Sequence, residues 1–317
     1  MKRMAILTRD CAGVNAAIRA AVRTATPAGI EVLGVLRGYE GLIDGDFVPL
    51  DRRSVSGIIN AGGTILKTSR CERFFTAEGQ VSSVKNIKAR GIDGLLIIGG
   101  NGSLAGAHVL ASSHGVKVIG IPATIDNDLS GVDITIGADT AVNVALDALD
   151  KIRDTATSLE RIFIVEVMGR KCGSIAMQVA LAGGCEEVLL PEQDYDPLSM
   201  CREIQNGHAR GKVSWIIITA EGKARAQDAA AVVTRETGLE TRIAVLGHIQ
   251  RGGRPTAMDR ILAARLGHAA VEALIGGKSD VCVHYRNGQI EFLPLEIAIR
   301  PKACPVADDY HLLKVLA

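Results

Sequence analysis

Short runs of β-branched residues alternate with alanine-rich amphipathic segments along almost the whole chain. This alternation is typical of βαβ units around a mostly parallel sheet, so the sequence predicts an α/β fold. The predicted strands cover residues 4–8, 32–36, 95–99, 116–121, 162–167, 187–190, 215–219 and 243–247.

Three further segments have clear local patterns. Residues 15–26 open with Asn15, a residue type that favours helix N-caps, and residues 139–155 repeat apolar positions at helical spacing, so both are predicted helices. After Asp280, two apolar runs flank a turn at residues 286–288, which predicts an antiparallel hairpin at a sheet edge.

Composition limits the classes of function. The chain has 317 residues, 47% of them hydrophobic, which suffices for a full core and suggests two lobes. Its 36 basic and 35 acidic residues give a net charge of +1, so no overall field attracts nucleic acid or a membrane surface. Any anion site must therefore be assembled locally.

The N-terminus and the cysteines suggest a location. The apolar stretch at residues 4–7 is too short for a signal peptide or a membrane span, so we expect a cytoplasmic protein. The cysteines form no CxxC pair, which disfavours a disulfide framework and a zinc site. We expect reduced thiols, most of them core residues, at positions 11, 71, 172, 185, 201, 282 and 304.

Ligands of parallel sheets bind beyond the carboxyl ends of the strands, so the turns there are candidate sites. One predicted strand leads into a turn at Gly99–Ser103 whose backbone N–H groups could hold phosphate oxygens, although glycines also serve tight turns. The next strand leads into Asp126 and Asp128. One of these acids could deprotonate a sugar hydroxyl and the other hold magnesium, or both could simply favour the turn.

Several cations also lie near strand ends. They are Arg161, Arg170, Arg242, His248 and Arg251. The arginine guanidinium suits phosphate because it donates two parallel hydrogen bonds. A single arginine is often a solvated charge and a single histidine a structural group, but five such groups together favour an anion site.

The strings GGNGS, PATIDND, RIFIVEVMGR, TAEG and TRIAVLGHIQRGG, in this order, resemble the bacterial-type 6-phosphofructokinase family over essentially the whole chain. The resemblance implies two similar Rossmann-like lobes with the active site in the cleft between them. The larger, nucleotide-binding lobe would comprise residues 1–137 plus 250–300. The smaller, sugar-phosphate lobe would comprise residues 138–249 plus 301–317.

The resemblance also implies a reaction, in which a glycolytic kinase transfers a phosphoryl group from ATP to the 1-hydroxyl of fructose 6-phosphate, with Mg²⁺ and without a covalent intermediate. Asp126 would be the base, Arg170 would steady the transferred group, and Thr124 and Asp128 would shape the loop. The sugar-phosphate residues would be Thr124, Ile125, Asp126, Met168, Gly169, Arg170, Glu221, His248 and Arg251, with Arg161 and Arg242 from a neighbouring subunit of a homotetramer.

Nucleotide and effector sites follow from the same resemblance. The nucleotide would contact Arg70, Cys71, Gly100, Asn101, Gly102 and Ser103, with Asn101 and Asp128 at the metal. A nucleotide or an acidic metabolite would act as effector. Arg19 and Arg23 share a predicted helix face, which spacing alone would equally explain as a solvated basic face. The implied effector residues are Arg19, Arg23, Arg52, Arg153, Gly184, Glu186, Arg210 and Lys212.

The chain departs from the family at three places. The loop after the first strand is two residues shorter and lacks a Gly-Gly pair, and Arg9 there could bind phosphates or obstruct them. Asn101 replaces a usual aspartate, which should weaken magnesium binding. Gly102 and Ala123 leave room for adenosine, which favours ATP over pyrophosphate. The alternatives are a pyrophosphate-dependent enzyme and a non-catalytic regulatory or metabolite-binding homologue.

Overall fold

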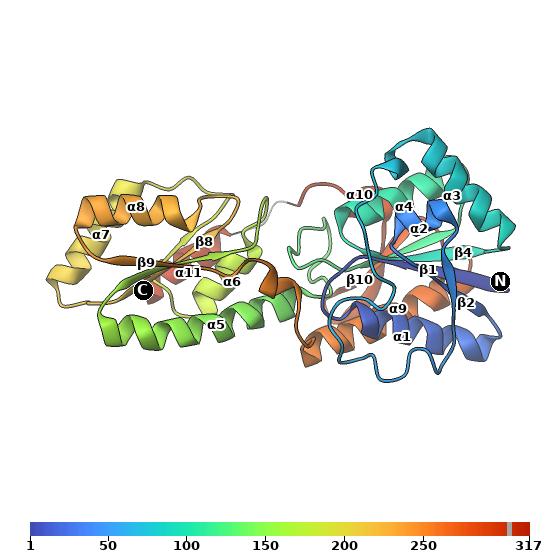
Figure 1. Ribbon diagram of the computed structural model, residues 1–317, viewed down its shortest axis with the longest axis horizontal. Coiled ribbons are helices and arrows are strands. Elements are labelled where there is room, and N and C mark those ends of the chain that lie inside the picture. Colours follow the sequence, from blue (N-terminus) through green and yellow to red (C-terminus); the bar gives the residue numbers. More distant parts are fainter. Residues whose placement is uncertain (303–305) are drawn as a thin grey trace. The chain divides into compact units, whose positions relative to one another are not determined.

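The computed structural model describes residues 1–302 and 306–317 and divides the chain into two compact units. Unit 1 contains Met1–Thr140 and Arg251–Lys302, and unit 2 contains Ala141–Gln250 and the described C-terminal residues 306–317. Each unit has a mostly or entirely parallel sheet flanked by helices, so the predicted α/β class is confirmed (Figure 1).

The sheet of unit 1 has the order β11-β10-β5-β4-β1-β2-β3. Its five central strands are parallel, whereas β3 and β11 pair antiparallel at the two edges. All six residues of β4 are buried, as expected for a central strand covered on both faces. The strands are β1 (Arg3–Thr8), β2 (Glu31–Val35), β3 (Phe47–Leu50), β4 (Gly94–Gly99), β5 (Val118–Pro122), β10 (Val281–Arg286) and β11 (Gln289–Pro294).

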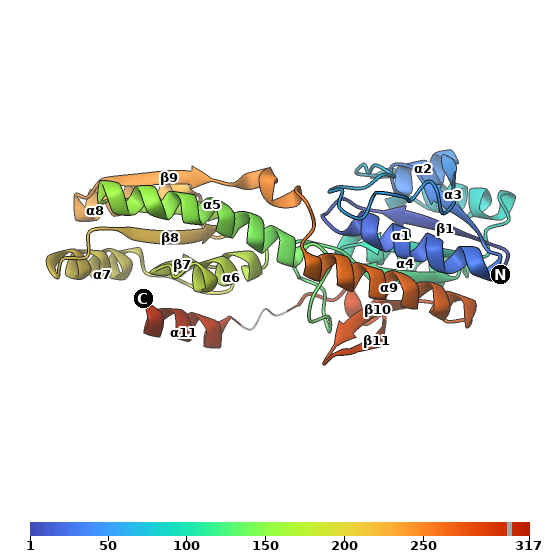
Figure 2. The ribbon, with the colours of Figure 1, turned by 90° about the horizontal axis from the view of Figure 1, so that it is seen from below.

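Helices cover both faces of this sheet. Two of them, α1 and α9, pack side by side on one face, as Figure 2 shows in blue and orange. The shorter helices α2, α3, α4 and α10 lie on the other face. The helices are α1 (Val14–Ala25), α2 (Tyr39–Asp44), α3 (Ala77–Ala89), α4 (Asn101–His114), α9 (Ala257–Ile275) and α10 (Leu295–Ala298), with 3₁₀ turns η1 (Thr26–Ala28) and η2 (Arg73–Phe75).

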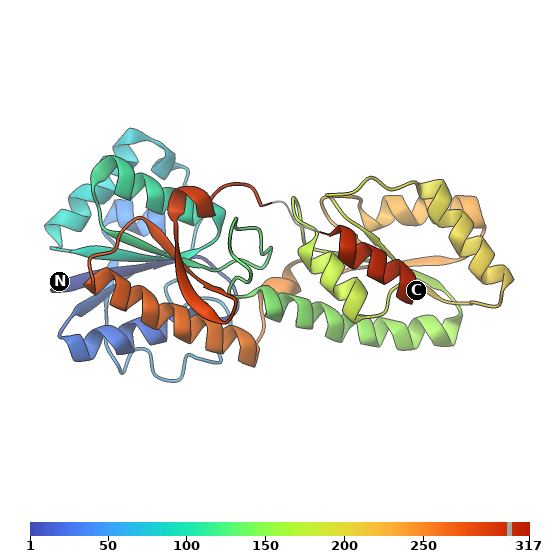
Figure 3. The same ribbon diagram turned by 180° about the vertical axis from the view of Figure 1, so that it is seen from behind.

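Unit 2 has a fully parallel sheet in the order β7-β8-β6-β9. Helices α7 and α8 pack against each other over one face, and α11 packs against α6 and β7, as seen from behind in Figure 3. The elements are α5 (Ala138–Leu159), β6 (Ile162–Val167), α6 (Ser174–Ala182), β7 (Glu187–Leu189), α7 (Pro197–Ala209), β8 (Trp215–Ala220), α8 (Ala226–Thr237), β9 (Thr241–Val245), η3 (Gly247–Arg251) and α11 (Ala307–Leu316).

Most predicted elements are present, with three corrections. The strand predicted at 243–247 is shifted to β9, and the edge strand β3 was missed because it is short and contains Pro49. Asn15 is not the N-cap of α1, since Gly13 holds that position with φ 96°. The Asn15 side chain instead binds a loop of unit 1: its Nδ2 donates to the Ala61 carbonyl at 3.1 Å and its Oδ1 accepts from the Ile65 N–H at 2.9 Å.

The described cysteines fit the expectation with one exception. Cys11, Cys185, Cys201 and Cys282 are free and buried, and Cys71 is free and half-buried. Cys172 is disulfide-bonded, so the expectation of a reduced thiol is wrong there. Cys304 lies outside the described residues. Among the described helices, none combines the length and apolar character needed to span a bilayer.

Candidate active site

Three adjacent parallel strands of unit 1 bring the predicted phosphate and acid loops to one edge of the sheet. Strand β4 pairs with both β1 and β5, and the register aligns Thr8 with Ile98 and Gly99 with Pro122. The segments that leave these strands therefore begin side by side. They are the loop from Arg9, the turn at 100–103 and the acid loop at 123–128.

Asn101 and Asp128 meet across two of these loops. Asn101 Nδ2 donates to Asp128 Oδ2 at 2.7 Å. The Oδ1 atoms of both residues are buried and have no hydrogen-bond partner among the described residues. Amide and carboxylate oxygens are donors that Mg²⁺ accepts, and buried oxygens without partners are costly unless a ligand completes them. This pair therefore fits a magnesium ion.

The acid loop is held in a single shape by its own side chains. Asp126 N–H donates to Thr124 Oγ1 at 3.2 Å, and Thr135 Oγ1 donates to the Thr124 carbonyl at 2.6 Å. Asn127 adopts φ 49° and ties the loop to its return segment by donating to the Asp133 carbonyl at 3.0 Å. Asp126 is half-buried within this loop, so part of the residue is accessible to a ligand. A general base must come within hydrogen-bond distance of the proton that it accepts.

Lys302 supports the same loop from the C-terminal part of unit 1. Its Nζ donates to the carbonyls of Asn127 and Val132, both at 2.9 Å. Burial lowers the pKa of Lys302, whereas the charges of Asp133 and Asp128 raise it. The sequence analysis missed this residue, because a lysine far along the chain carries no signal of the loop it holds.

The segment at 61–71 borders the site on the β1 side. Thr8 Oγ1 and Thr64 Oγ1 lie 2.8 Å apart in a hydrogen bond, and Arg9 Nη1 donates to the Ser69 carbonyl at 2.6 Å. Arg70 is exposed on this segment. Burial and a hydrogen bond with Glu40 raise the pKa of Cys71 to about 11, so its thiol is protonated at neutral pH.

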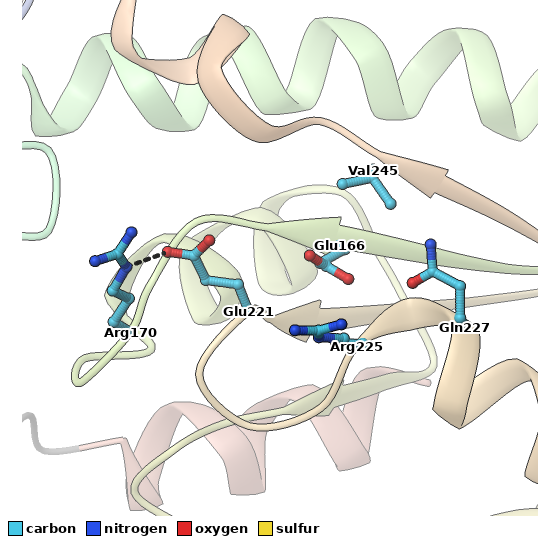
Figure 4. A pocket seen from close by; sticks show the side chains of 6 residues that line it. All are labelled: Glu166, Arg170, Glu221, Arg225, Gln227 and Val245. Carbon is cyan, nitrogen blue, oxygen red and sulfur yellow. Dashed lines mark hydrogen bonds and ion pairs between the residues drawn. The ribbon is translucent and has the colours of Figure 1, made fainter.

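Unit 2 has its own pocket at the carboxyl ends of β6 and β8. The pocket has a volume of about 520 Å³ and combines acidic and basic side chains. Arg170 Nε and Glu221 Oε1 form an ion pair at 3.3 Å, drawn in Figure 4. Arg170 is 74% exposed, so its guanidinium is accessible to a ligand. The lining residues are Glu166, Arg170, Glu221, Arg225, Gln227 and Val245.

Backbone geometry explains the residue types around that pocket. Gly169 has φ 140°, and a Cβ there would lie 2.6 Å from the Cys172 carbonyl. The neighbouring Met168 is buried, and its N–H donates to Gln250 Oε1 at 3.3 Å. Of the pocket residues, Arg170 and Glu221 were predicted from sequence, whereas Glu166, Arg225, Gln227 and Val245 were missed. Glu166 also accepts the Ala226 N–H at 2.8 Å, so it fixes the start of α8.

Arg161 and Arg242 lie at the amino ends of β6 and β9, whereas the pocket lies at the carboxyl ends of the strands. Arg161 Nε pairs with Glu240 Oε2 at 2.8 Å, and Arg242 pairs with the other oxygen of that carboxylate. Arg161 precedes β6 and Met168 follows it, so seven residue steps, about 23 Å of strand, separate them. One copy of unit 2 therefore does not gather these arginines with Arg170. His248 is exposed on η3.

The predicted effector residues divide between the two units, and those of unit 2 form local contacts. Glu186 is buried, accepts the Ile216 N–H at 2.7 Å and pairs with Lys212 at 3.1 Å. Arg153 donates to the Gly183 carbonyl and, at 3.0 Å, to that of Gly184. Arg210 is also in unit 2, whereas Arg19, Arg23 and Arg52 belong to unit 1.

The chain is similar to known proteins over most of its length. The family model described as phosphofructokinase matches residues 3–274. A Clostridium botulinum protein named ATP-dependent 6-phosphofructokinase is 50% identical over 100% of both chains. A Thermus thermophilus protein named ATP-dependent 6-phosphofructokinase 1 is 51% identical over 94% of each chain.

Solved structures show the same fold. Phosphofructokinase from Saccharomyces cerevisiae superposes with a TM-score of 0.88 at 32% identity, and the alignment covers 94% of this chain but only 45% of the yeast chain. A structure titled pyrophosphate-dependent phosphofructokinase from Marinobacter aquaeolei gives a TM-score of 0.86 at 24% identity, over 100% and 91% of the two chains. The second likeness concerns the fold alone.

Proposed function

Since the chain belongs to the phosphofructokinase family, we propose that it transfers the γ-phosphoryl group of ATP to the 1-hydroxyl of fructose 6-phosphate. The products are fructose 1,6-bisphosphate and ADP. The observation that carries the proposal is the hydrogen bond between Asn101 and Asp128, in the loop that also contains Asp126. The two side chains offer oxygens suited to a metal ion, and Asp126 is positioned as a base beside them.

Asp126 accepts the proton of the attacking 1-hydroxyl, and the hydrogen bond between its N–H and Thr124 Oγ1 orients it. Asn101 and Asp128 would hold Mg²⁺, since each has a buried Oδ1 without a partner among the described residues, and the bound ion would supply charge stabilisation for the phosphate oxygens. Arg170 in unit 2 offsets the negative charge of the transferred group. No covalent intermediate is required, because positioning and charge stabilisation suffice for this reaction.

ATP rather than pyrophosphate is the proposed phosphoryl donor. A Cβ placed on Gly102 would meet no atom within 4 Å, so the turn leaves open space where the nucleoside extends. The two Clostridium and Thermus relatives are named ATP-dependent. A pyrophosphate-dependent enzyme is the runner-up, and a non-catalytic homologue is disfavoured because the Asp126 loop and the Asn101–Asp128 pair are both assembled.

We also propose that the active form is a homo-oligomer, expected to be a tetramer. Arg161 and Arg242 lie at the other end of the strands from Arg170, so we expect them to serve a sugar-phosphate site only in a second copy. The edge strand β9 exposes Ile243 and Val245, by 42% and 51% respectively, which favours burial against such a copy. A nucleotide or acidic metabolite effector and a cytoplasmic location complete the proposal.

The deciding experiment offers purified protein fructose 6-phosphate and magnesium with ATP or pyrophosphate in turn. Formation of fructose 1,6-bisphosphate is measured, and Asp126→Ser serves as the matched inactive variant. ATP-dependent product formation supports the proposal. Product with pyrophosphate alone would establish the runner-up, and sugar-phosphate binding without any product would establish the non-catalytic homologue.

A further inference from the structure

Arg9 directly follows β1, at the carboxyl ends of the parallel strands of unit 1. Its N–H donates to the Ile98 carbonyl at 2.9 Å, so Arg9 extends the pairing of β1 with β4 by one residue. A Cβ placed on Gly99 would lie 3.1 Å from Arg9 Cγ. The aliphatic part of Arg9 therefore covers the end of β4, immediately before the turn at 100–103.

The guanidinium of Arg9 is anchored on the neighbouring segment. Arg9 Nη1 donates to the Ser69 carbonyl at 2.6 Å and to Thr68 Oγ1 at 3.2 Å. These contacts fix the charge beside Arg70, which follows in the chain. The group is thus held, half-buried, between two segments at which a nucleotide phosphate is expected.

A third arginine comes from the later part of unit 1. Residues 251–253 pack against the same segment, because a Cβ on Gly62 would lie 2.4 Å from the Gly253 carbonyl oxygen. Burial first, and then the charges of Arg70 and Arg251, lower the pKa of Arg9, whereas Asp10 raises it. The positive charges of Arg70 and Arg251 therefore both act on the Arg9 guanidinium.

Arg9, Arg70 and Arg251 form a group of basic residues whose charge no ion-paired carboxylate among the described residues balances. Within residues 1–302 and 306–317, no carboxylate forms an ion pair with Arg9, Arg70 or Arg251. Three gathered cations with a single acid, Asp10, near one of them favour the binding of an anion with several charged oxygens. A polyphosphate matches this requirement because each guanidinium can donate two parallel hydrogen bonds.

We propose that Arg9 is a phosphate-binding residue for the nucleotide, which it would contact with its charged side chain beside the turn at 100–103. This inference rests on the proposed function, which supplies the nucleotide. Arg9 serves the nucleotide rather than the sugar phosphate because its side chain is fixed against Ser69 and against Gly99.

The test compares Arg9→Gln with the native protein. Glutamine retains an N–H donor for the Ser69 carbonyl but removes the charge, so folding should be preserved, which thermal unfolding checks. Arg286→Gln at the end of β10 is the matched control outside the site. Calorimetry measures the affinity for a non-hydrolysable ATP analogue with Mg²⁺, for adenosine, and for fructose 6-phosphate.

We expect Arg9→Gln to weaken binding of the ATP analogue at least tenfold, the range for a lost hydrogen bond to a charged group, with adenosine and fructose 6-phosphate changed less than twofold. The affinity of Arg9→Lys for the ATP analogue should lie between that of the native protein and that of Arg9→Gln. Unchanged or tighter binding of the analogue to a folded Arg9→Gln would overturn the proposal, the second result showing that Arg9 obstructs. Failure of the native protein to bind the analogue would instead contradict the proposed function.

Discussion

Asn101 Nδ2 donates to Asp128 Oδ2 at 2.7 Å. The Oδ1 atoms of the two side chains are buried and accept no hydrogen bond from the described residues. The amide thus donates to one carboxylate oxygen, and the pair presents one amide oxygen and one carboxylate oxygen in place of the two acids that a hard cation prefers. The pair should therefore bind a hard cation less tightly than two acids would.

Asn101→Asp should therefore tighten magnesium binding and destabilise the metal-free protein. The substitution adds a charged ligand, but it also places two carboxylates in contact and removes the Nδ2 donor. We expect the magnesium concentration for half-maximal activity to fall several-fold and the metal-free midpoint of thermal unfolding to fall by about 2–4 °C. Asn101→Ala, which removes the ligand altogether, should raise the magnesium requirement.

Asp126→Ser should reduce turnover by about a hundredfold or more and leave fructose 6-phosphate binding nearly intact, because a general base acts on the proton and not on binding. Steady-state kinetics and calorimetry measure the two effects separately. Asp150→Asn on the exposed face of α5 is the matched control. A native turnover number in Asp126→Ser would remove Asp126 from its proposed role.

Lys302→Met should lower kcat without a comparable change in KM. Lys302 Nζ holds the carbonyls of Asn127 and Val132 at 2.9 Å, so its loss leaves the acid loop free to shift. Small misplacements of a reacting group cost about tenfold to a hundredfold in rate. Kinetics of Lys302→Met should be compared with those of Lys85→Met, an exposed site on α3. An equal loss in both would mean a general effect on folding.

His284 should make the protein sensitive to acid. It is 2% exposed on β10, and burial lowers its pKa below the ordinary value of 6.5, although Glu291 and Asp133 raise it and Arg286 lowers it further. Between 6.5 and the lower folded value the unfolded chain binds more protons, so stability falls as pH falls through this window. Unfolding midpoints from pH 7.5 to 5 measure the effect, and His284→Leu should flatten it. If the unfolding midpoint of His284→Leu changes with pH as steeply as that of the native protein, His284 is not the cause of the acid sensitivity.

The helices and strands were largely predictable from the sequence. Strands buried on both faces of a parallel sheet consist of continuous apolar runs, as in β4 and β8. The acid loop and the glycine turn were found because each directly follows such a run. Contacts between distant segments were not predictable: Lys302 and Asn127 are 175 residues apart, and Glu240 joins Arg161 to Arg242 by pairing that no local pattern records.

Mixing two inactive variants should restore activity if Arg242 serves a second copy. In Asp126→Ser the base is missing, and in Arg242→Ser the sugar-phosphate contact is missing, so each variant alone should be nearly inactive. In a hybrid pair across a two-fold interface, one site receives both defects and the other receives none. Random pairing of equal amounts makes half of the pairs hybrid, so about a quarter of native activity should return after dissociation and reassembly. No recovery, with hybrids verified by mass, would place Arg242 outside the site of the neighbouring copy.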